Sequence, residues 1–372
     1  MEWGLYTMRP FNLVFEKSFY EEALDDSDVA CLLATPRGKP LNDLFATARA
    51  LREHVFGDQI FLYGFVYFST YCQNYCNFCL YRQCNQAAPR YRKSIENILD
   101  VARALEYHGV HLIDLTMGED PYYLQRDGER LLELVVRMRE AVSLPLMVSP
   151  GVLKSEILIE MAQQGVDWYA CYQETFNERL FARLRKGQDF NRRLEAKVHA
   201  RQAGLLLEEG ILLGVGESPS DIALALRYMQ NLGTSQMRAM TFRPQHGTPM
   251  ANWQVPDSLD ELRIIATLRI SFPDRLIPAS LDVDGLEGLR ARLNAGANVV
   301  TSVIPPGYGL AGVSRAWLGI EDRQRTVSSV ASVIKGMGLT IAPVSRYQSW
   351  FEKEKRRVGR QDRMDSKSRQ PG

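Results

Sequence analysis

Apolar residues follow two different periods along the chain, and the change between them marks a boundary. Up to residue 56 the apolar positions follow helical spacing, and Gly57 ends the pattern. The positions that define this stripe are Leu41, Leu44, Phe45, Ala48, Leu51 and Val55. Beyond it, short apolar runs alternate with amphipathic stretches of helical period. The pattern predicts a helical extension over residues 1–59 and an alternating β and α region over residues 60–340.

Eight short apolar runs carry the β pattern. They cover residues 61–70, 111–117, 145–149, 167–172, 208–215, 236–242, 276–282 and 298–304. Helical stretches lie between them, such as those that begin at Ser94 and at Leu259. This alternation favours parallel strands joined by right-handed crossovers, and eight units are typical of a TIM-type (β/α)8 barrel, closed or partly open. A doubly wound open sheet is the alternative, but no Gly-x-Gly-x-x-Gly turn follows the first run.

The last stretch of the chain shows neither pattern. From Lys353 onward the residues are polar and basic, without apolar periodicity. We therefore predict that residues 341–372 form a C-terminal extension that is largely disordered and solvated. A weak phosphate-binding arm is the less favoured interpretation.

The composition of the chain favours a folded globular protein. The chain has 372 residues, 45% of them hydrophobic, and 45 Lys and Arg against 44 Asp and Glu. These values are ordinary for a folded globular protein. The even charge balance gives no sign of binding to nucleic-acid phosphates. No window approaches the ~20 apolar residues of a membrane span, and no signal peptide is visible, so we expect a cytoplasmic protein with no nucleic-acid or membrane partner.

The strongest chemical signal is a group of three cysteines just past the first predicted strand. Cys72, Cys76 and Cys79 stand at Cys-x3-Cys-x2-Cys spacing in FSTYCQNYCNFC. Thiolates select zinc or iron–sulfur centres. A structural zinc site usually has four ligands, whereas here Cys84 stands alone nearby and no histidine is close in sequence. A [4Fe–4S] cluster held by only three cysteines keeps one iron open for a ligand, and this interpretation is favoured.

Three predicted strands carry charge where a barrel core is normally apolar. Asp114 lies in HLIDLTM, Arg238 in QMRAMTF, and Asp282 ends LIPASLD, with Ser280 two residues earlier on the same face. A lone buried charge is costly, so these groups need partners. One interpretation is an internal salt-bridge network. The other is a site for a diamino acid such as lysine, whose two ammonium groups and one carboxylate match two carboxylates and one guanidinium.

Polar residues also follow the predicted strands, at the barrel end where active sites lie. Glu119 follows the second run, Ser149 ends the third, and Glu174 follows the fourth, with Arg193 nineteen positions later. A carboxylate and a guanidinium suit a cofactor with an amino-acid part. Each residue alone fits an ordinary loop or helix surface. Together with the cysteines they indicate a cofactor site, and the indication is strongest for Glu174 and Arg193.

The cysteine motif resembles that of the radical S-adenosylmethionine (SAM) superfamily, in which Cys-x3-Cys-x-aromatic-Cys follows the first barrel strand. Phe78 occupies the aromatic position. The resemblance implies that Cys72, Cys76 and Cys79 bind a [4Fe–4S] cluster whose open iron is chelated by SAM. One electron from a reductant such as a flavodoxin or ferredoxin would then cleave SAM to a 5′-deoxyadenosyl radical. TMGEDP is similar to the superfamily's Gly-Gly-Glu turn, and YQET with the later arginine resembles the branch of biotin synthase and hydrogenase maturases.

Longer stretches resemble one family in that superfamily, the methylornithine synthases, which open pyrrolysine biosynthesis. These stretches include LIDLTMGEDPYY, LRKGQDF, MTFRPQHGTP, LIPASLDVDG and RLNAGANVVTSVIPP. The resemblance implies isomerisation of L-lysine to (3R)-3-methyl-D-ornithine by hydrogen abstraction, fragmentation and recombination. It also implies that Arg238 and Ser280 hold the substrate carboxylate, while Asp114 and Asp282 hold its amino groups.

Two alternatives stay open. Another enzyme of the same branch would keep the cysteine motif, but a thiol or thiazolidine substrate would not need the charged interior, and only scattered cysteines remain for a second cluster as in biotin synthase. A metal-stabilised binding protein would hold zinc and would not turn over SAM. Arg243 and His246 stand in MTFRPQHGTP, where less polar residues are expected in the family. We expect His246 to be an ordinary loop histidine.

Overall fold

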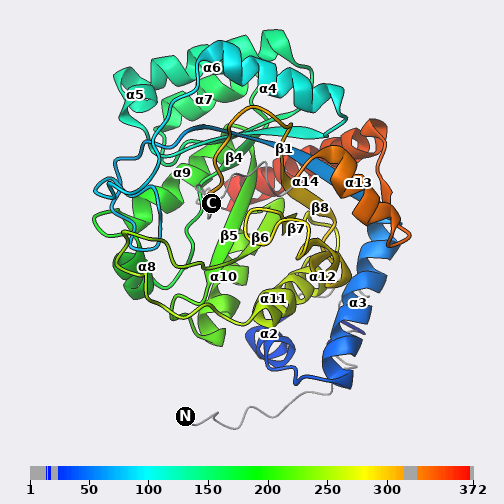
Figure 1. The fold of residues 1–372 in the computed structure, drawn as a ribbon. Helices are drawn as coiled ribbons and strands as arrows, with labels where there is room; N and C mark the ends of the chain where they lie inside the picture. Colours follow the sequence, from blue (N-terminus) through cyan, green and yellow to red (C-terminus); the bar gives the residue numbers. More distant parts are fainter. Residues whose placement is uncertain (1–13, 15, 18–23, 314–324, 369–372) are drawn as a thin grey trace.

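A ring of eight parallel strands lies at the centre of the computed structural model, which describes residues 14, 16–17, 24–313 and 325–368 (Figure 1). The strands are β1 (Gln59–Ser69), β2 (Leu112–Met117), β3 (Leu146–Ser149), β4 (Trp168–Ala170), β5 (Leu206–Leu213), β6 (Gln236–Thr241), β7 (Pro278–Ser280) and β8 (Val299–Val303). All eight runs predicted from the sequence are strands. Their order, β6-β5-β4-β3-β2-β1-β8-β7, confirms the TIM-type (β/α)8 barrel. Among the described residues, a single bridge between Gln236 and Leu276 links β6 to β7, so the ring is least tightly closed there.

Helices surround the ring and connect successive strands (Figure 1). They are α4 (Ile95–Tyr107), α5 (Pro121–Leu124), α6 (Glu129–Ala141), α7 (Ser155–Gln163), α8 (Glu178–Leu184), α9 (Phe190–Gln202), α10 (Pro219–Asn231), α11 (Ser258–Ser271), α12 (Leu289–Asn294) and α13 (Val327–Lys335). Side-chain caps fix several of their starts. Ser94, Asp189 and Ser218 each accept a backbone N–H of the first turn of the helix that follows.

The helices α2 (Asp26–Leu33) and α3 (Lys39–Phe56) precede the ring. The apolar stripe of α3 is buried and packs beside α11. Gly57 follows α3 with a φ of 67°, a left-handed conformation that favours glycine, and its N–H closes the helix on the Glu53 carbonyl at 2.9 Å. The helix therefore ends where the sequence pattern ends.

The C-terminal segment contradicts the prediction of disorder. β9 (Thr340–Ile341) pairs with β1, and α14 (Val344–Ser368) passes behind the strands in Figure 1. Tyr347, Trp350, Glu354 and Val358 are buried at helical spacing, which gives α14 an inward face. The prediction was wrong because the basic residues from Lys353 onward hide this sparse stripe in the composition. None of the described helices combines the length and the apolar character that a membrane span requires.

Candidate active site

A cavity lies at the C-terminal ends of the strands. It is open to solvent on one side. Seven of the eleven residues predicted from the sequence line it: Cys79, Asp114, Ser149, Glu174, Arg238, Ser280 and Asp282. The structure therefore brings the predicted cofactor residues and the predicted substrate residues to one space.

The three cysteines of the motif lie on the loop after β1. Cys76 is buried, while Cys72 and Cys79 are half-buried. Burial raises the pKa of Cys72 to about 11. Burial, followed by the neighbouring thiols of Cys76 and Cys72, raises the pKa of Cys79 still further, so these two thiols lie close enough to Cys79 to act on its charge. Within the described residues, no three His, Cys, Asp or Glu side chains are arranged to hold a single metal ion. A donor set of three thiols is suited to iron–sulfur chemistry.

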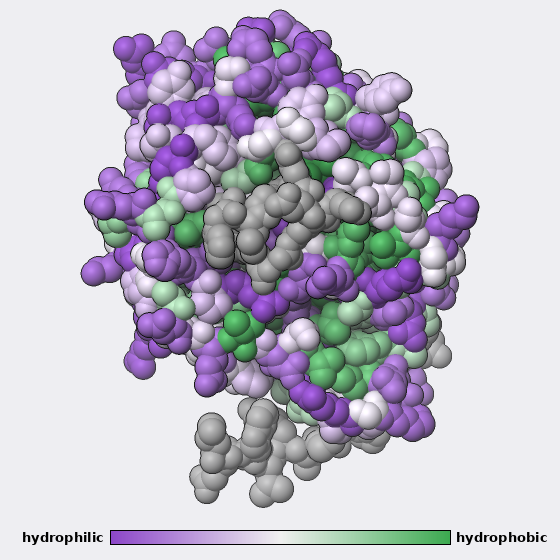
Figure 2. Space-filling model, viewed as in Figure 1, coloured by the Kyte–Doolittle hydropathy of each residue, from purple (hydrophilic) through white to green (hydrophobic). Residues whose placement is uncertain are grey.

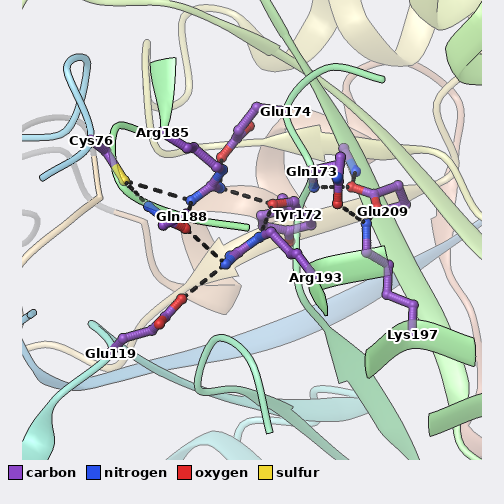
Figure 3. A network of polar contacts seen from close by, with 11 residues as sticks. Cys76, Glu119, Tyr172, Gln173, Glu174, Arg185, Gln188, Arg193, Lys197 and Glu209 are labelled. Carbon is purple, nitrogen blue, oxygen red and sulfur yellow. Dashed lines mark hydrogen bonds and ion pairs between the residues drawn. The ribbon is translucent and has the colours of Figure 1, made fainter. Parts of the chain in front are cut away.

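Two side chains from the segment after α8 reach the buried cysteine (Figure 3). Gln188 Nε2 lies 3.0 Å from Cys76 Sγ, and Arg185 Nη1 lies 3.6 Å from it. The backbone N–H of Asn77 donates to the Leu184 carbonyl at 2.8 Å, which joins the cysteine loop to the end of α8. N–H donors beside a thiolate sulfur stabilise its charge and tune a bound metal centre. Sequence reasoning missed both donors because more than a hundred positions separate them from the motif.

Glu119 and Arg193 form a buried ion pair, with Oε1 and Nη1 2.9 Å apart. Arg193 also donates through Nε to the Tyr172 carbonyl at 2.8 Å and through Nη1 to Gln188 Oε1 at 3.1 Å (Figure 3). Burial opposes the ionisation of Glu119, but the guanidinium overcomes it and lowers the pKa of this carboxyl. A Cβ on Gly151 would lie 2.0 Å from Glu119 Cγ, so only glycine there leaves room for the pair.

Glu174 has a left-handed backbone, with φ at 69°. Its Oε1 accepts a hydrogen bond from Arg185 Nη2 at 2.8 Å, and its carbonyl accepts one from the Leu212 N–H at 3.0 Å. The other carboxylate oxygen, Oε2, is buried without a hydrogen-bond partner among the described residues. A strained residue with an unpaired acceptor on a cavity wall is a position where a ligand hydroxyl or ammonium would complete the hydrogen bonding.

A buried lysine–glutamate pair holds the residue before Glu174. Lys197 contacts Glu209 and donates to Gln173 Oε1 at 2.8 Å. Glu209 Oε1 accepts the backbone N–H groups of Gln173, at 2.7 Å, and of Gly210, at 2.9 Å (Figure 3). Burial lowers the pKa of Lys197 despite this carboxylate. The pair fixes the backbone that presents Glu174, a role that the sequence pattern of β5 did not reveal.

Arg238 and Asp114 lie deeper, inside the ring. Nε and Nη2 of Arg238 are 2.7 and 2.6 Å from Glu208 Oε1, and Nη1 donates to Thr301 Oγ1 at 2.9 Å. Asp114 accepts a hydrogen bond from Thr116 at 2.9 Å and has no ion-pair partner in the part of the chain that the structure describes. Burial, followed by the charge of Glu208, raises the pKa of Asp114 to about 7. A cation brought to Asp114 would therefore be strongly stabilised.

Asp282 has a cationic partner that sequence reasoning missed. Arg325 Nη1 lies 3.3 Å from Asp282 Oδ1, and Nη2 donates to its carbonyl at 2.9 Å. The Val313 N–H donates to the same Oδ1 at 3.1 Å, and Ser280 Oγ accepts the Asp282 N–H at 3.2 Å. Arg325 follows the last barrel strand by more than twenty positions, so nothing in the strand pattern indicated that it returns to the interior.

The charge count made from the sequence was therefore incomplete. The three charged residues singled out in the sequence and their direct ion-pair partners make up three carboxylates, of Asp114, Glu208 and Asp282, and two guanidinium groups, of Arg238 and Arg325. Three negative charges against two positive charges leave one net negative charge. The count of Asp114, Arg238 and Asp282 alone gives the same net charge. Both interpretations of these residues hold in part, because two of the carboxylates are paired internally while Asp114 is available to a ligand.

Two further residues singled out in the sequence lie at the rim or outside. Arg243 Nη2 donates to Asp284 Oδ1 at 2.8 Å, beside the cavity. The His246 side chain is exposed, and its carbonyl accepts a hydrogen bond from Asn85 at 2.9 Å. The position of His246 is that of a surface loop histidine, as expected.

The chain is similar to known proteins in both sequence and structure. Residues 66–229 match the model of the radical SAM superfamily. The chain is 41% identical over 339 residues to 3-methylornithine synthase of Methanosarcina barkeri, covering 91% of this chain and 96% of that protein. It is 29% identical over 260 residues to the [FeFe] hydrogenase maturase subunit HydE of Thermotoga maritima, covering 69% and 74%. A crystal structure of methylornithine synthase (PylB) matches with a TM-score of 0.86 at 41% identity, covering 91% of this chain and 99% of that one.

Proposed function

The chain belongs to the 3-methylornithine synthase family of radical SAM enzymes, and from this premise we propose that it isomerises L-lysine to (3R)-3-methyl-D-ornithine for pyrrolysine biosynthesis. The observation that carries the substrate assignment is the charged interior with one net negative charge. L-lysine brings two ammonium groups and one carboxylate, and so one net positive charge. The thiol or thiazolidine substrate of a related branch would leave these buried charges unmatched.

Membership of the superfamily implies a [4Fe–4S] cluster and SAM, and the residues present fit both. We assign the cluster to Cys72, Cys76 and Cys79, and SAM to Glu119, Ser149, Glu174 and Arg193. The thiols of Cys72 and Cys76 lie near that of Cys79, and the unpaired Oε2 of Glu174 is an acceptor that a bound ligand would satisfy. When bound, the cluster and SAM supply the 5′-deoxyadenosyl radical that abstracts a hydrogen from the substrate.

The chain's own contribution is to orient the substrate and exclude water. Arg238 and Ser280 would hold the carboxylate of lysine, while Asp114 and Asp282 would hold its ammonium groups. An ammonium beside Asp114 favours the charged carboxylate, whose pKa burial otherwise raises to about 7. Anchors at both ends of the substrate would keep two fragments in place while a carbon–carbon bond is broken and remade. A one-electron reductant such as a flavodoxin or ferredoxin would be needed to start the reaction.

The test is anaerobic reconstitution of the protein with iron and sulfide, followed by incubation with L-lysine, SAM and dithionite. We expect methylornithine as the product. Formation of 5′-deoxyadenosine without methylornithine would reject lysine as the substrate and retain the radical activity. A colourless zinc protein without SAM cleavage would reject both. In Asp282→Asn we expect slow SAM cleavage uncoupled from product, and full lysine turnover in this variant would contradict the assigned anchors.

A further inference from the structure

The part of the chain that carries the cysteines is basic. Between Gln59 and Ile95 there is no Asp or Glu, whereas four Lys and Arg occur there: Arg82, Arg90, Arg92 and Lys93. The net charge of the whole chain is only +1. Asp120 neutralises Arg92, with Oδ2 and Nε 2.6 Å apart, while Arg82 and Arg90 form no ion pair among the described residues, so the segment around the cysteines keeps a local excess of positive charge. In Figure 2 the side that carries this loop and α8, on the left, is mostly hydrophilic.

A second basic segment lies against the cysteine loop. Asn77 donates through its backbone N–H to the Leu184 carbonyl at 2.8 Å and through Nδ2 to the Arg183 carbonyl at 2.7 Å. Arg183, Lys186 and Arg192 of this segment are exposed, and none forms an ion pair within the described residues. The two carboxylates in the same stretch are Glu178, at the other end of α8, and Asp189, which caps α9.

We call the exposed surface formed by these segments the cysteine-loop face. Its residues are Tyr75, Arg82, Arg183, Lys186 and Arg192. Tyr75 directly precedes Cys76 and its side chain is 44% exposed. Arg82 is half-buried and donates to the Tyr75 carbonyl at 3.4 Å. The face thus combines an exposed aromatic ring with cations that have no carboxylate partner in the described structure.

Only a thin layer of protein separates this face from the buried cysteine. Arg185 and Gln188 both contact Cys76 Sγ, at 3.6 and 3.0 Å, while Lys186 and Gly187 between them are exposed to solvent (Figure 3). One short loop therefore touches the sulfur on its inner side and water on its outer side. Electron transfer between proteins slows steeply with distance, so this loop is a short route from the surface to a centre held by Cys76.

We propose that the cysteine-loop face docks an acidic one-electron carrier protein, which reduces the centre beneath it. The inference rests on the proposed cluster at Cys72, Cys76 and Cys79. In the docked complex the carrier loses one electron and the cluster gains it, and no bond forms or breaks. Unpaired surface cations attract an acidic partner and speed its encounter. Electron-transfer complexes bury little surface and are transient, so a face built from a few exposed side chains is sufficient.

Charge reversal tests the docking surface, with an acidic flavodoxin as the probe. The reconstituted double variant Lys186→Glu/Arg192→Glu changes two exposed side chains outside the proposed active site. The control is Lys335→Glu/Lys353→Glu, which reverses two exposed lysines on α13 and α14. Calorimetry would give the Kd for oxidised flavodoxin at low and high salt, and stopped-flow absorbance would give the rate of cluster reduction by reduced flavodoxin.

In the first variant we expect the Kd to rise at least ~10-fold at low salt and cluster reduction to slow in proportion. The difference from wild type should shrink at high salt, because salt screens exposed charges. The control should stay within about twofold of wild type, and turnover driven by saturating dithionite should be unchanged in both. Equal effects in the two variants, or none in either, would overturn the proposal. Dithionite-driven product formation tests the proposed function separately, since it bypasses the docking surface.

Discussion

The two ends of the same eight strands are built in opposite ways. At the N-terminal end, aromatic rings close the barrel: Trp168 and Trp350 stack with centroids 6.0 Å apart, and the hydroxyls of Tyr63 and Tyr347 are 2.9 Å apart. At the C-terminal end, charged side chains of both signs stand among the apolar and polar residues that line the open cavity, and Asp114 has no ion-pair partner among the described residues.

The difference shows how one fold separates stability from function. The closed end gains from apolar burial and aromatic contact. The open end instead keeps the half-buried carboxylate of Asp114, whose pKa is raised, and Glu174 in a left-handed conformation, both of which cost free energy until a ligand arrives. Substitutions at the open end should therefore impair activity without loss of stability, while substitutions at the closed end should do the reverse.

The largest effect is expected at Asp114, the carboxylate of the open end. In Asp114→Asn, kcat/KM for lysine should fall at least ~100-fold, because an ammonium loses its charged partner. The free energy of unfolding at pH 8 should rise, by on the order of 1–3 kcal/mol, because an ionised carboxylate no longer has to be buried.

The raised pKa of Asp114 predicts how the stability of the protein changes with pH. Its pKa is about 7 in the folded protein and about 4 in an unfolded chain. Between these values the folded state binds a proton that the unfolded state does not, so this group favours folding increasingly as pH falls from 8 to 5. Urea unfolding at both pH values should show this contribution in wild type and in the control Thr116→Val, but not in Asp114→Asn. Unchanged kcat/KM in Asp114→Asn would contradict the proposed role of Asp114 in binding lysine.

An intermediate effect is expected from the closed end. Trp350 is buried on α14, stacks on Trp168 and donates to the Asp274 carbonyl at 3.1 Å. Trp350→Ala should lower the free energy of unfolding by about 3–5 kcal/mol, with KM for lysine unchanged at a temperature where the protein stays folded. The matched control is Trp253→Ala, since Trp253 is 38% exposed and its loss should cost less than about 1 kcal/mol. Equal losses in both would show that α14 does not hold the barrel end.

The smallest effect is expected at His111, also at the closed end. Its Nδ1 accepts the Leu62 N–H at 2.9 Å, so Nε2 carries the proton and donates to the Ala342 carbonyl at 2.8 Å. Burial lowers the pKa of His111, so its contribution to stability is complete above pH ~6.5 and is lost as pH falls below that value. Protonation removes one hydrogen bond, worth about 1 kcal/mol.

His111→Gln separates this contribution from that of Asp114, which has the opposite sign. Glutamine can accept one hydrogen bond and donate another, but it does not titrate. As pH falls from 7.5 to 5.5, the free energy of unfolding measured with urea should therefore decrease more, or increase less, in wild type than in the variant. Parallel curves would mean that the folded protein does not discriminate against the protonated ring.

The fold could be predicted from the sequence to a large extent, because strand and helix periods are local properties. The eight apolar runs became β1 to β8, and Gly57 ends α3 as its position suggested. The prediction failed at α14, where the buried positions are few and stand among basic residues. There the packing against the barrel, and not the composition of the segment, determines that the chain is helical.

The candidate site was predictable where side chains lie at strand ends or in one short motif. The cysteine triplet, Asp114 and Arg238 are of this kind. Arg185, Gln188, Glu208 and Arg325 could not be found in this way, because their partners are distant in sequence or on a neighbouring strand. Ion pairs across the ring depend on which strands are neighbours, and a single sequence does not state this.

What the sequence by itself determined is the order of the elements and the kinds of chemical group that follow each strand, since hydrophobic period and short motifs are local. Only the tertiary structure decided which of those groups are paired. Folding placed Glu208 on Arg238 and Arg325 on Asp282, and it left Asp114 without an ion-pair partner among the described residues. The physical reason is that a buried charge must be neutralised by whatever lies within a few ångströms, and proximity is a property of the closed barrel, not of the chain.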